Sequence, residues 1–136
     1  MIYLLDTNIC IHILKSRSLN VLKNAKRKTD SYFLISDITV GELWYGVSKS
    51  SKIQENEQNL IKFLQSFETL PFNTEHAREY GFLREEQRKK GKSIGFHDLM
   101  IAAQAINMEA VLVTANQKEF SQIKELRLEN WLNANP

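Results

Sequence analysis

Three acidic residues of this chain, Asp6, Glu42 and Asp98, each lie at the edge of a strongly apolar stretch. Asp6 ends an unbroken apolar run, Glu42 lies inside the mostly apolar segment DITVGELWYGV, and Asp98 begins DLMIAAQAI. A carboxylate close to a core is costly unless an arginine, a lysine or a metal ion accompanies it. No Lys or Arg lies within four residues of Asp6 or Glu42 along the chain. Because oxygen ligands without a His/Cys pattern favour Mg²⁺ or Mn²⁺ over zinc, these acids point to a hard-metal site.

Each acid also has a purely structural explanation. Asp6 is a good helix cap, and the helix macrodipole favours Asp98 near a helix start by ~0.3–1 kcal/mol. Glu42 can lie on the surface of an amphipathic helix, and Glu119 on an exposed final turn. These explanations are less satisfactory together, because at least three acids would then approach the core with no evident partner.

The elements that would position these acids alternate short β-like runs with longer helical patterns. Asp37 is expected to cap the third helix, and Pro71 to push the third strand to a sheet edge. The strands are expected at 2–5, 32–36, 68–72 and 110–114, with a short edge strand in the tail LRLENWL, and the helices at 7–14, 19–28, 38–47, 52–67, 74–90 and 98–107.

Continuous apolar strands separated by helices indicate a parallel sheet covered on both faces. With right-handed crossovers, this pattern predicts an α/β fold, a three-layer α/β/α sandwich around four to five short strands. Ligands of such sheets bind beyond the carboxyl ends of the strands, where the strand order reverses. Asp6 follows the first strand, whereas Thr114, Asn116 and Glu119 follow the fourth. If those two strands are neighbours, these polar side chains share one cleft.

Composition narrows the class of protein. The length of 136 residues predicts a single domain over 1–136. The lone cysteine, Cys10, excludes an internal disulfide and fits a reducing cytosol, so we expect a cytoplasmic protein. The first fifteen residues lack the basic region of a signal peptide, and no stretch approaches the ~18 apolar residues of a membrane span. The net charge of +2 permits a nucleic-acid partner without requiring one.

Four segments, in order along the chain, resemble PIN-domain ribonucleases, and most of all the VapC toxins of bacterial toxin–antitoxin modules. They are LLDTN at 4–8, ITVGELWYG at 38–46, GFHDLMIAA at 95–103 and LVTANQKEF at 112–120. The resemblance spans essentially the whole chain. It implies a PIN-like sandwich and an endoribonuclease that requires Mg²⁺, or Mn²⁺ in its place. In that family the commonest substrate class is tRNA, whose cleavage inhibits translation.

The resemblance also assigns roles position by position. It implies that Asp6, Glu42 and Asp98 are catalytic, metal-binding acids. Many members carry an Asp where this chain has Asn116, so Glu119 is expected to be the fourth acid, with Asn116 as a neutral ligand or orienting residue. This departure puts the strong binding of a second metal ion in doubt. Glu42 or Glu119 is the expected helper in proton removal.

Residues around the acids have supporting roles in this scheme. The hydroxyls of Thr7 and Thr114 are expected to orient the metal ligands. His97 is expected to point to another helix face than Asp98, as a packing or substrate-edge residue, with a catalytic base as the alternative. The basic cluster that precedes Asp98 is expected to contact RNA phosphates, and it consists of Arg84, Arg88, Lys89, Lys90 and Lys92.

Two partners follow from the resemblance: a cognate VapB-type antitoxin and a second copy in a homodimer. In the family the antitoxin tail packs on apolar helices and often sends an arginine towards the acids. The candidate surface, which can equally be core, consists of Ile9, Ile13, Trp44, Tyr45 and Val47. Two other functions stay open. One is a related metal-dependent hydrolase of DNA or small phosphoesters, and the other is a catalytically silent PIN-like binding module, of which Asn116 is the only hint.

Overall fold

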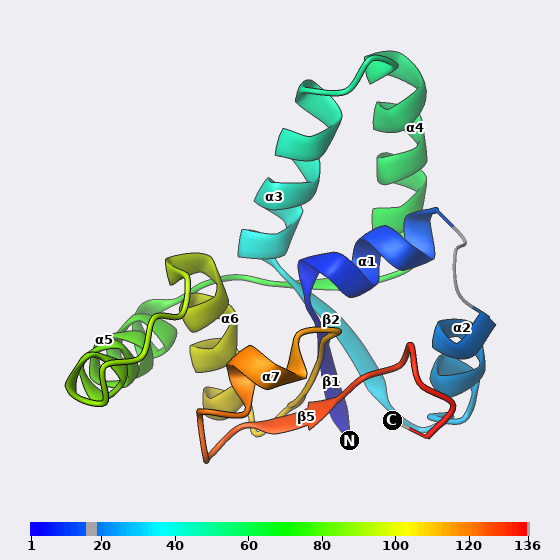
Figure 1. The fold of residues 1–136 in the computed structure, drawn as a ribbon. Coiled ribbons are helices and arrows are strands. Elements are labelled where there is room, and N and C mark those ends of the chain that lie inside the picture. The colour runs from blue at the N-terminus through cyan, green and yellow to red at the C-terminus, as the bar shows by residue number, and fades with distance from the viewer. Residues whose placement is uncertain (16–18, 136) are drawn as a thin grey trace.

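A computed structural model describes residues 1–15 and 19–135, which contain five strands and seven helices (Figure 1). The strands are β1 (Ile2–Leu5), β2 (Tyr32–Ser36), β3 (Glu68–Leu70), β4 (Val111–Val113) and β5 (Arg127–Glu129). The helices are α1 (Thr7–Leu14), α2 (Leu19–Lys26), α3 (Asp37–Ser48), α4 (Ile53–Leu64), α5 (Thr74–Lys89), α6 (Phe96–Asn107) and α7 (Gln117–Phe120).

The five strands form one parallel sheet in the order β3-β2-β1-β4-β5. Leu5 at the end of β1 is in register with Ile35 on one side and with Val113 on the other. The chain therefore builds outward from β1 through β2 to β3, and then crosses to the opposite side of β1 to form β4 and β5. The first and fourth strands are neighbours, which meets the condition for a shared cleft, and the strand order reverses between their carboxyl ends.

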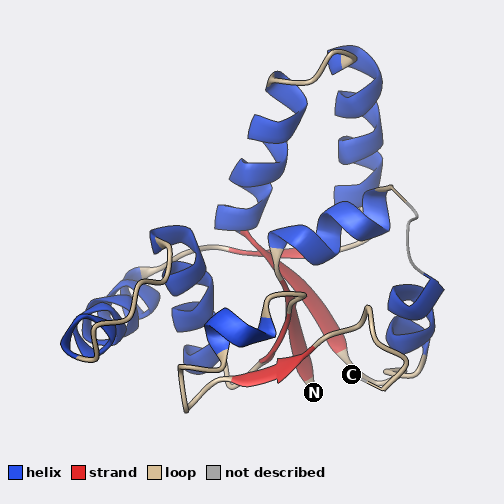
Figure 2. Ribbon diagram, in the orientation of Figure 1, coloured by secondary structure: helices blue, strands red, loops and turns tan. Residues whose placement is uncertain are grey.

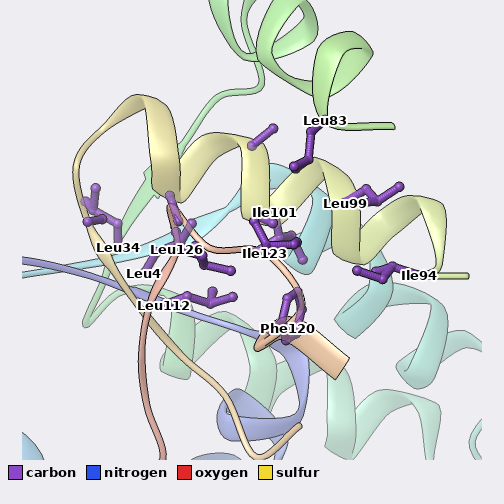
Figure 3. Packing of buried hydrophobic residues seen from close by; sticks show 14 residues of the cluster. Leu4, Leu34, Leu83, Ile94, Leu99, Ile101, Leu112, Phe120, Ile123 and Leu126 are labelled. Atoms are coloured by element: carbon purple, nitrogen blue, oxygen red, sulfur yellow. The ribbon is translucent and has the colours of Figure 1, made fainter. Parts of the chain in front are cut away.

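Two hydrophobic cores cover the two faces of the sheet, so the α/β/α layering is confirmed (Figure 2). Because side chains alternate along a strand, Leu4 and Leu112 face α6, whereas Leu5 and Val113 face the helices of the other layer. Figure 3 shows α6 lying between Leu83 of α5 and the sheet residues Leu4 and Leu112. Full burial of each such leucine contributes about 1.5–3 kcal/mol. This packing holds α6, and with it Asp98, in place against the sheet.

Helix α6 is apolar nearly all round, as its sequence indicates, and it packs closely against α5 and the sheet. On the other side, α3 and α4 form a hairpin that projects away from the sheet, with α1 lying across its base (Figure 1). Within residues 1–15 and 19–135, no helix has both the length and the apolarity needed to cross a bilayer.

Some predicted boundaries were wrong by a few residues. Ser36, not Asp37, caps α3, because the Ser36 hydroxyl accepts the Ile38 N–H at 3.0 Å while Asp37 becomes the first helical residue. Helix α6 begins two residues earlier than expected, at Phe96. Helix α1 has the predicted bounds, and α3 extends one residue further than predicted at each end. Helices α2, α4 and α5 stop one to three residues inside the predicted limits, and β4 loses a residue at each end because its neighbours pair only through Val111–Val113.

Candidate active site

The site begins where β1 and β4 end side by side. The Asp6 backbone N–H donates to the Val113 carbonyl at 3.0 Å, which holds Asp6 at the carboxyl edge of the sheet. Its carboxylate caps α1 by accepting the Ile9 N–H at 3.0 Å, and it also accepts a hydrogen bond from the buried Thr114 side chain. Asp6 is only 5% exposed. Asp6 therefore caps α1 and also presents a carboxylate at the carboxyl edge of the sheet, where β1 and β4 end. The helix-cap explanation and the metal-ligand explanation of Asp6 are compatible.

A short chain of hydrogen bonds follows β4. The Asn116 backbone N–H donates to the Thr114 hydroxyl at 2.9 Å. The Asn116 side-chain amide then donates to the Glu119 carboxylate of α7. Asn116 thus orients Glu119, which was one of the two roles expected of it.

Glu42 reaches the same region from α3. The Thr7 hydroxyl donates to Glu42 Oε1 at 2.8 Å, and its oxygen also lies 3.4 Å from that of the buried Thr39. Glu42 Oε2 lies 3.7 Å from His97 Nδ1. The first turn of α6 directs the largely exposed His97 ring at Glu42 across the helix interface, a contact that the sequence did not predict.

Sequence reasoning missed Thr39. Thr39 lies one helical turn before Glu42, so the two side chains share a face of α3. A polar residue at that spacing from a candidate acid is the signal that the sequence offered. Its complete burial beside Thr7 required the tertiary packing of α1 against α3.

Asp98 completes the group from the first turn of α6, where it is half-buried. Burial raises its pKa to about 6, helped by the negative charges of Glu119, Asp6 and Glu42 and opposed by His97. Burial likewise raises the pKa of Asp6, against hydrogen bonds from Thr114 and the Ile9 N–H that lower it, and Glu42 raises it further. The negative charges of three carboxylates from distant parts of the sequence therefore act on Asp98.

No basic side chain of the described residues neutralises the cluster. Among residues 1–15 and 19–135, no Lys or Arg forms an ion pair with any of the four acids, and only His97 approaches one of them. In the same part of the chain, no three His, Cys, Asp or Glu side chains are arranged to hold one ion directly. Because like charges repel and hydrogen bonds from Thr7 and Asn116 hold two of the carboxylates, this spread arrangement is expected without a cation. The all-oxygen donor set and the uncompensated charge fit a divalent ion such as Mg²⁺ or Mn²⁺.

The predicted RNA-binding cluster divides into paired and unpaired cations. Arg88 binds Glu85 at 2.5 and 3.0 Å, and Lys90 pairs with Glu86 at 3.3 Å. The remaining cluster members, Arg84, Lys89 and Lys92, are exposed and form no ion pair with a described residue. Paired cations have part of their charge compensated, so these three are the better placed to attract an anion.

The predicted partner surface needs one correction. Ile9 is fully buried in the core between α1 and the sheet, so it cannot contact a partner. Tyr45 is 65% exposed, whereas Ile13, Trp44 and Val47 are half-buried. A groove of about 450 Å³ runs between α1, α3 and α4. Its lining includes the apolar residues Ile11, Leu14, Tyr45 and Val47, and also Glu42.

Comparisons with known proteins show which family and fold this chain resembles. A family model described as PIN domain matches residues 3–126. The chain is 44% identical over 135 residues to ribonuclease VapC2 of Rickettsia felis, and the match covers 96% of this chain and 98% of that protein. It is 36% identical over 129 residues to the tRNA(fMet)-specific endonuclease VapC of Salmonella typhimurium, covering 95% of this chain and 97% of that protein. A chain in the crystal structure of VapBC2 from Rickettsia felis, bound to a DNA fragment from their promoter, superimposes with a TM-score of 0.92 and 42% identity, covering 96% of this chain and 99% of that one.

Proposed function

This chain belongs to the PIN-domain family as a ribonuclease of the VapC type, and from that premise we propose that its four acids bind Mg²⁺ and cut tRNA. The observation that carries the proposal is the approach of Asp6, Glu42, Asp98 and Glu119 to one edge of the sheet, where no described Lys or Arg pairs with them. As in PIN-domain ribonucleases generally, a divalent metal ion is required, and its identity as Mg²⁺ is part of the proposal.

Each side chain has a distinct task in this scheme. Asp6 and Asp98, the two carboxylates whose pKa is raised, would hold the ion together with Glu119. A bound divalent ion would stabilise the negative charge that develops on the phosphoryl group. Glu42 is held by Thr7 on one oxygen and faces His97 with the other, so it is placed to accept a proton from an attacking water. Asn116 keeps Glu119 directed at the site.

The substrate enters as a polyanion. The exposed cations of α5 and the loop after it would contact its phosphates, which gives affinity and salt dependence but no choice of sequence. One relative is named for cleavage of tRNA(fMet), so transfer RNA is the substrate that we propose. An exposed single-stranded loop is the part of such a molecule that a protein can read.

A VapB-type antitoxin is the partner that we propose for the groove between α1, α3 and α4. Solved relatives from Rickettsia felis and Salmonella typhimurium are VapBC complexes, and the groove combines apolar walls with Glu42 at the acid cluster. A basic side chain of the antitoxin that reached Glu42 would neutralise the charge on which metal binding depends. Tyr45→Lys, which places a charge on the exposed wall, should release the toxin from inhibition without reducing RNA cleavage.

The test of the central proposal is cleavage mapping on total RNA with the purified chain in Mg²⁺, in Mn²⁺ and in EDTA. We expect cuts concentrated in tRNA that disappear in chelator and in the Asp98→Asn variant. Asp37→Asn removes the same charge from an exposed acid of α3 outside the cluster, so it is the matched control and should cut normally. Equal activity in EDTA, uncut tRNA, or preferential cutting of DNA in a parallel panel would each contradict the proposal.

Two further predictions accompany it. A single domain over residues 1–136 predicts one cooperative unfolding transition. A homodimer predicts twice the chain mass by light scattering.

A further inference from the structure

A second cavity lies near the acids, between α5 and the start of α6. Its volume is about 370 Å³, near the lower end of the ~300–1,000 Å³ typical of ligand sites, and its lining includes Arg84, Gln87, Lys92 and Phe96. The loop that closes it turns back at Gly91, whose φ of 66° ends α5, while the Lys92 N–H donates to the Gln87 carbonyl at 2.9 Å. The cavity is therefore built from one helix and the segment that leads directly to Asp98.

Gln87 is the unusual residue of this cavity. It is only 2% exposed, yet neither its amide oxygen nor its amide nitrogen has a hydrogen-bond partner among the described residues. A buried amide left without a hydrogen-bond partner destabilises the folded chain. A long apolar side chain would fill the same space without that cost, so the position calls for a ligand that pairs with the amide.

The mouth of the cavity presents a flat, cationic surface. The Arg84 guanidinium lies 4.2 Å from the centroid of the Phe96 ring, which is 57% exposed. Neither Arg84 nor Lys92 forms an ion pair with any described residue, whereas Arg88 on the rim is occupied by Glu85. Unstacked RNA bases stack on aromatic rings and on arginine planes.

These features together select one class of ligand. An amide offers a donor and an acceptor side by side, which matches the edge of a nucleobase, whereas a phosphate only accepts. The stacked Arg84 and Phe96 can pack on the face of a base, and the unpaired charges of Arg84 and Lys92 can contact the phosphate attached to it. An acidic peptide would use the charges but would leave the flat surface and the unpaired amide unexplained.

We infer that this cavity binds one unpaired nucleobase of the RNA, stacked at Arg84 and Phe96 and hydrogen-bonded by Gln87, next to the bond that is cut. The inference rests on the proposed ribonuclease function and adds recognition of the RNA sequence to it. Phe96 lies two residues before Asp98 in the same helix, so a base held here places its neighbouring phosphates beside the acid cluster. Gln87 and Phe96 are then determinants of specificity, and neither is a catalytic residue.

The experiment measures binding of a short, fluorescein-labelled single-stranded RNA in EDTA, where cleavage is blocked. A single abasic nucleotide is moved through the RNA, one position at a time. We expect about tenfold weaker binding when the abasic nucleotide occupies one particular position, since the stacking of one base on an aromatic ring contributes to binding by about this factor. Phe96→Ala should weaken the intact RNA by a similar factor and abolish the dependence on position.

Phe82→Ala is the matched control. Phe82 is a comparably exposed ring on α5 with Arg78 5.0 Å from its centroid, but it does not line the cavity. Its removal should leave binding unchanged. Gln87→Met removes the amide while keeping the length of the side chain, and it should lower the discrimination between bases at the sensitive position without lowering the melting temperature.

Several outcomes would overturn the inference. Equal binding of intact and abasic RNA at every position would mean that only phosphates are held. A lower melting temperature of Gln87→Met with unchanged base discrimination would show a structural amide, and a change from dimer to monomer in Phe96→Ala would assign the surface to a second copy. If the unsubstituted chain cuts RNA but shows no position dependence, the inference fails while the proposed function stands. If it neither binds nor cuts RNA, both fail.

Discussion

The carboxylates at the carboxyl edge of the sheet and those at the end of α5 have opposite electrostatic surroundings. Burial and neighbouring acids raise the pKa of Asp98 to about 6, whereas hydrogen bonding to Arg88 lowers the pKa of Glu85. At the end of α5, Glu85 and Glu86 each pair with a basic residue three or four positions later. At the sheet edge the acids come from different elements and meet one another. The difference teaches that the edge cluster keeps a negative charge that no Lys or Arg of the described residues compensates, and that a bound cation would compensate.

The largest expected effect comes from neutralising one acid of the cluster. Asp6→Asn should lower RNA cleavage by at least about 100-fold, because several kcal/mol of charge stabilisation depend on the ligands. The same variant should raise the free energy of unfolding by about 0.5–2 kcal/mol, because Asn still caps α1 while repulsion at the edge falls. Cleavage rates and urea unfolding measure the two effects. Full activity of Asp6→Asn, or a loss of both stability and activity, would contradict the contrast between the sheet edge and α5.

Thr114→Val tests whether hydrogen bonds hold the cluster together. The variant removes the donor to Asp6 and leaves the Asn116 N–H without its acceptor, so we expect a loss of about 1–3 kcal/mol in urea unfolding. Thr114→Ser keeps the hydroxyl and should keep most of the activity. A double-mutant cycle with Asp6→Asn isolates the Thr114–Asp6 bond, and a coupling energy near zero would show that the bond is not formed in solution.

Asp98 is expected to make the free energy of unfolding of the metal-free protein depend on pH by about 1 kcal/mol, after allowance for the screening of a half-exposed group. Its pKa is higher in the folded chain, about 6, than the ordinary value of 3.8, so between these values the folded state binds more protons than the unfolded state. Stability should therefore fall as the pH rises from about 4 to about 6, and the penalty should be complete above that range. Urea unfolding of the wild type and of Asp98→Asn in EDTA measures the difference. An identical pH slope in both proteins would contradict the raised pKa.

The smallest effect is expected on α5. Glu85→Gln breaks an exposed pair with Arg88, and exposed pairs contribute little because water competes for both charges. Thermal unfolding and RNA cleavage should both stay within experimental error of the wild type. A large change in either would mean that this pair belongs to a functional surface, and the contrast with the sheet edge would have to be redrawn.

Much of this protein is determined by local sequence. The apolar runs before Asp6 and before Thr114 predict buried strands, and their separation by helices predicts a parallel sheet, because only helical crossovers return the chain to a parallel neighbour. The same reasoning places Asp6 at a strand end. Limits of elements are less well determined, as Ser36 and Phe96 show, since caps and first turns compete over one or two residues.

Only the tertiary structure decided which side chains meet. The sequence contains no measure of the distance between α3 and α6, so it did not predict that His97 lies beside Glu42. It also left open whether Ile9 belongs to the core or to a partner surface. It also could not show that Gln87 is buried without a partner, because an unpaired amide is a property of its surroundings. Periodicity and propensity act between residues a few positions apart, and they therefore determined the elements. Burial and charge act between residues that the fold brings together, and they decided the site.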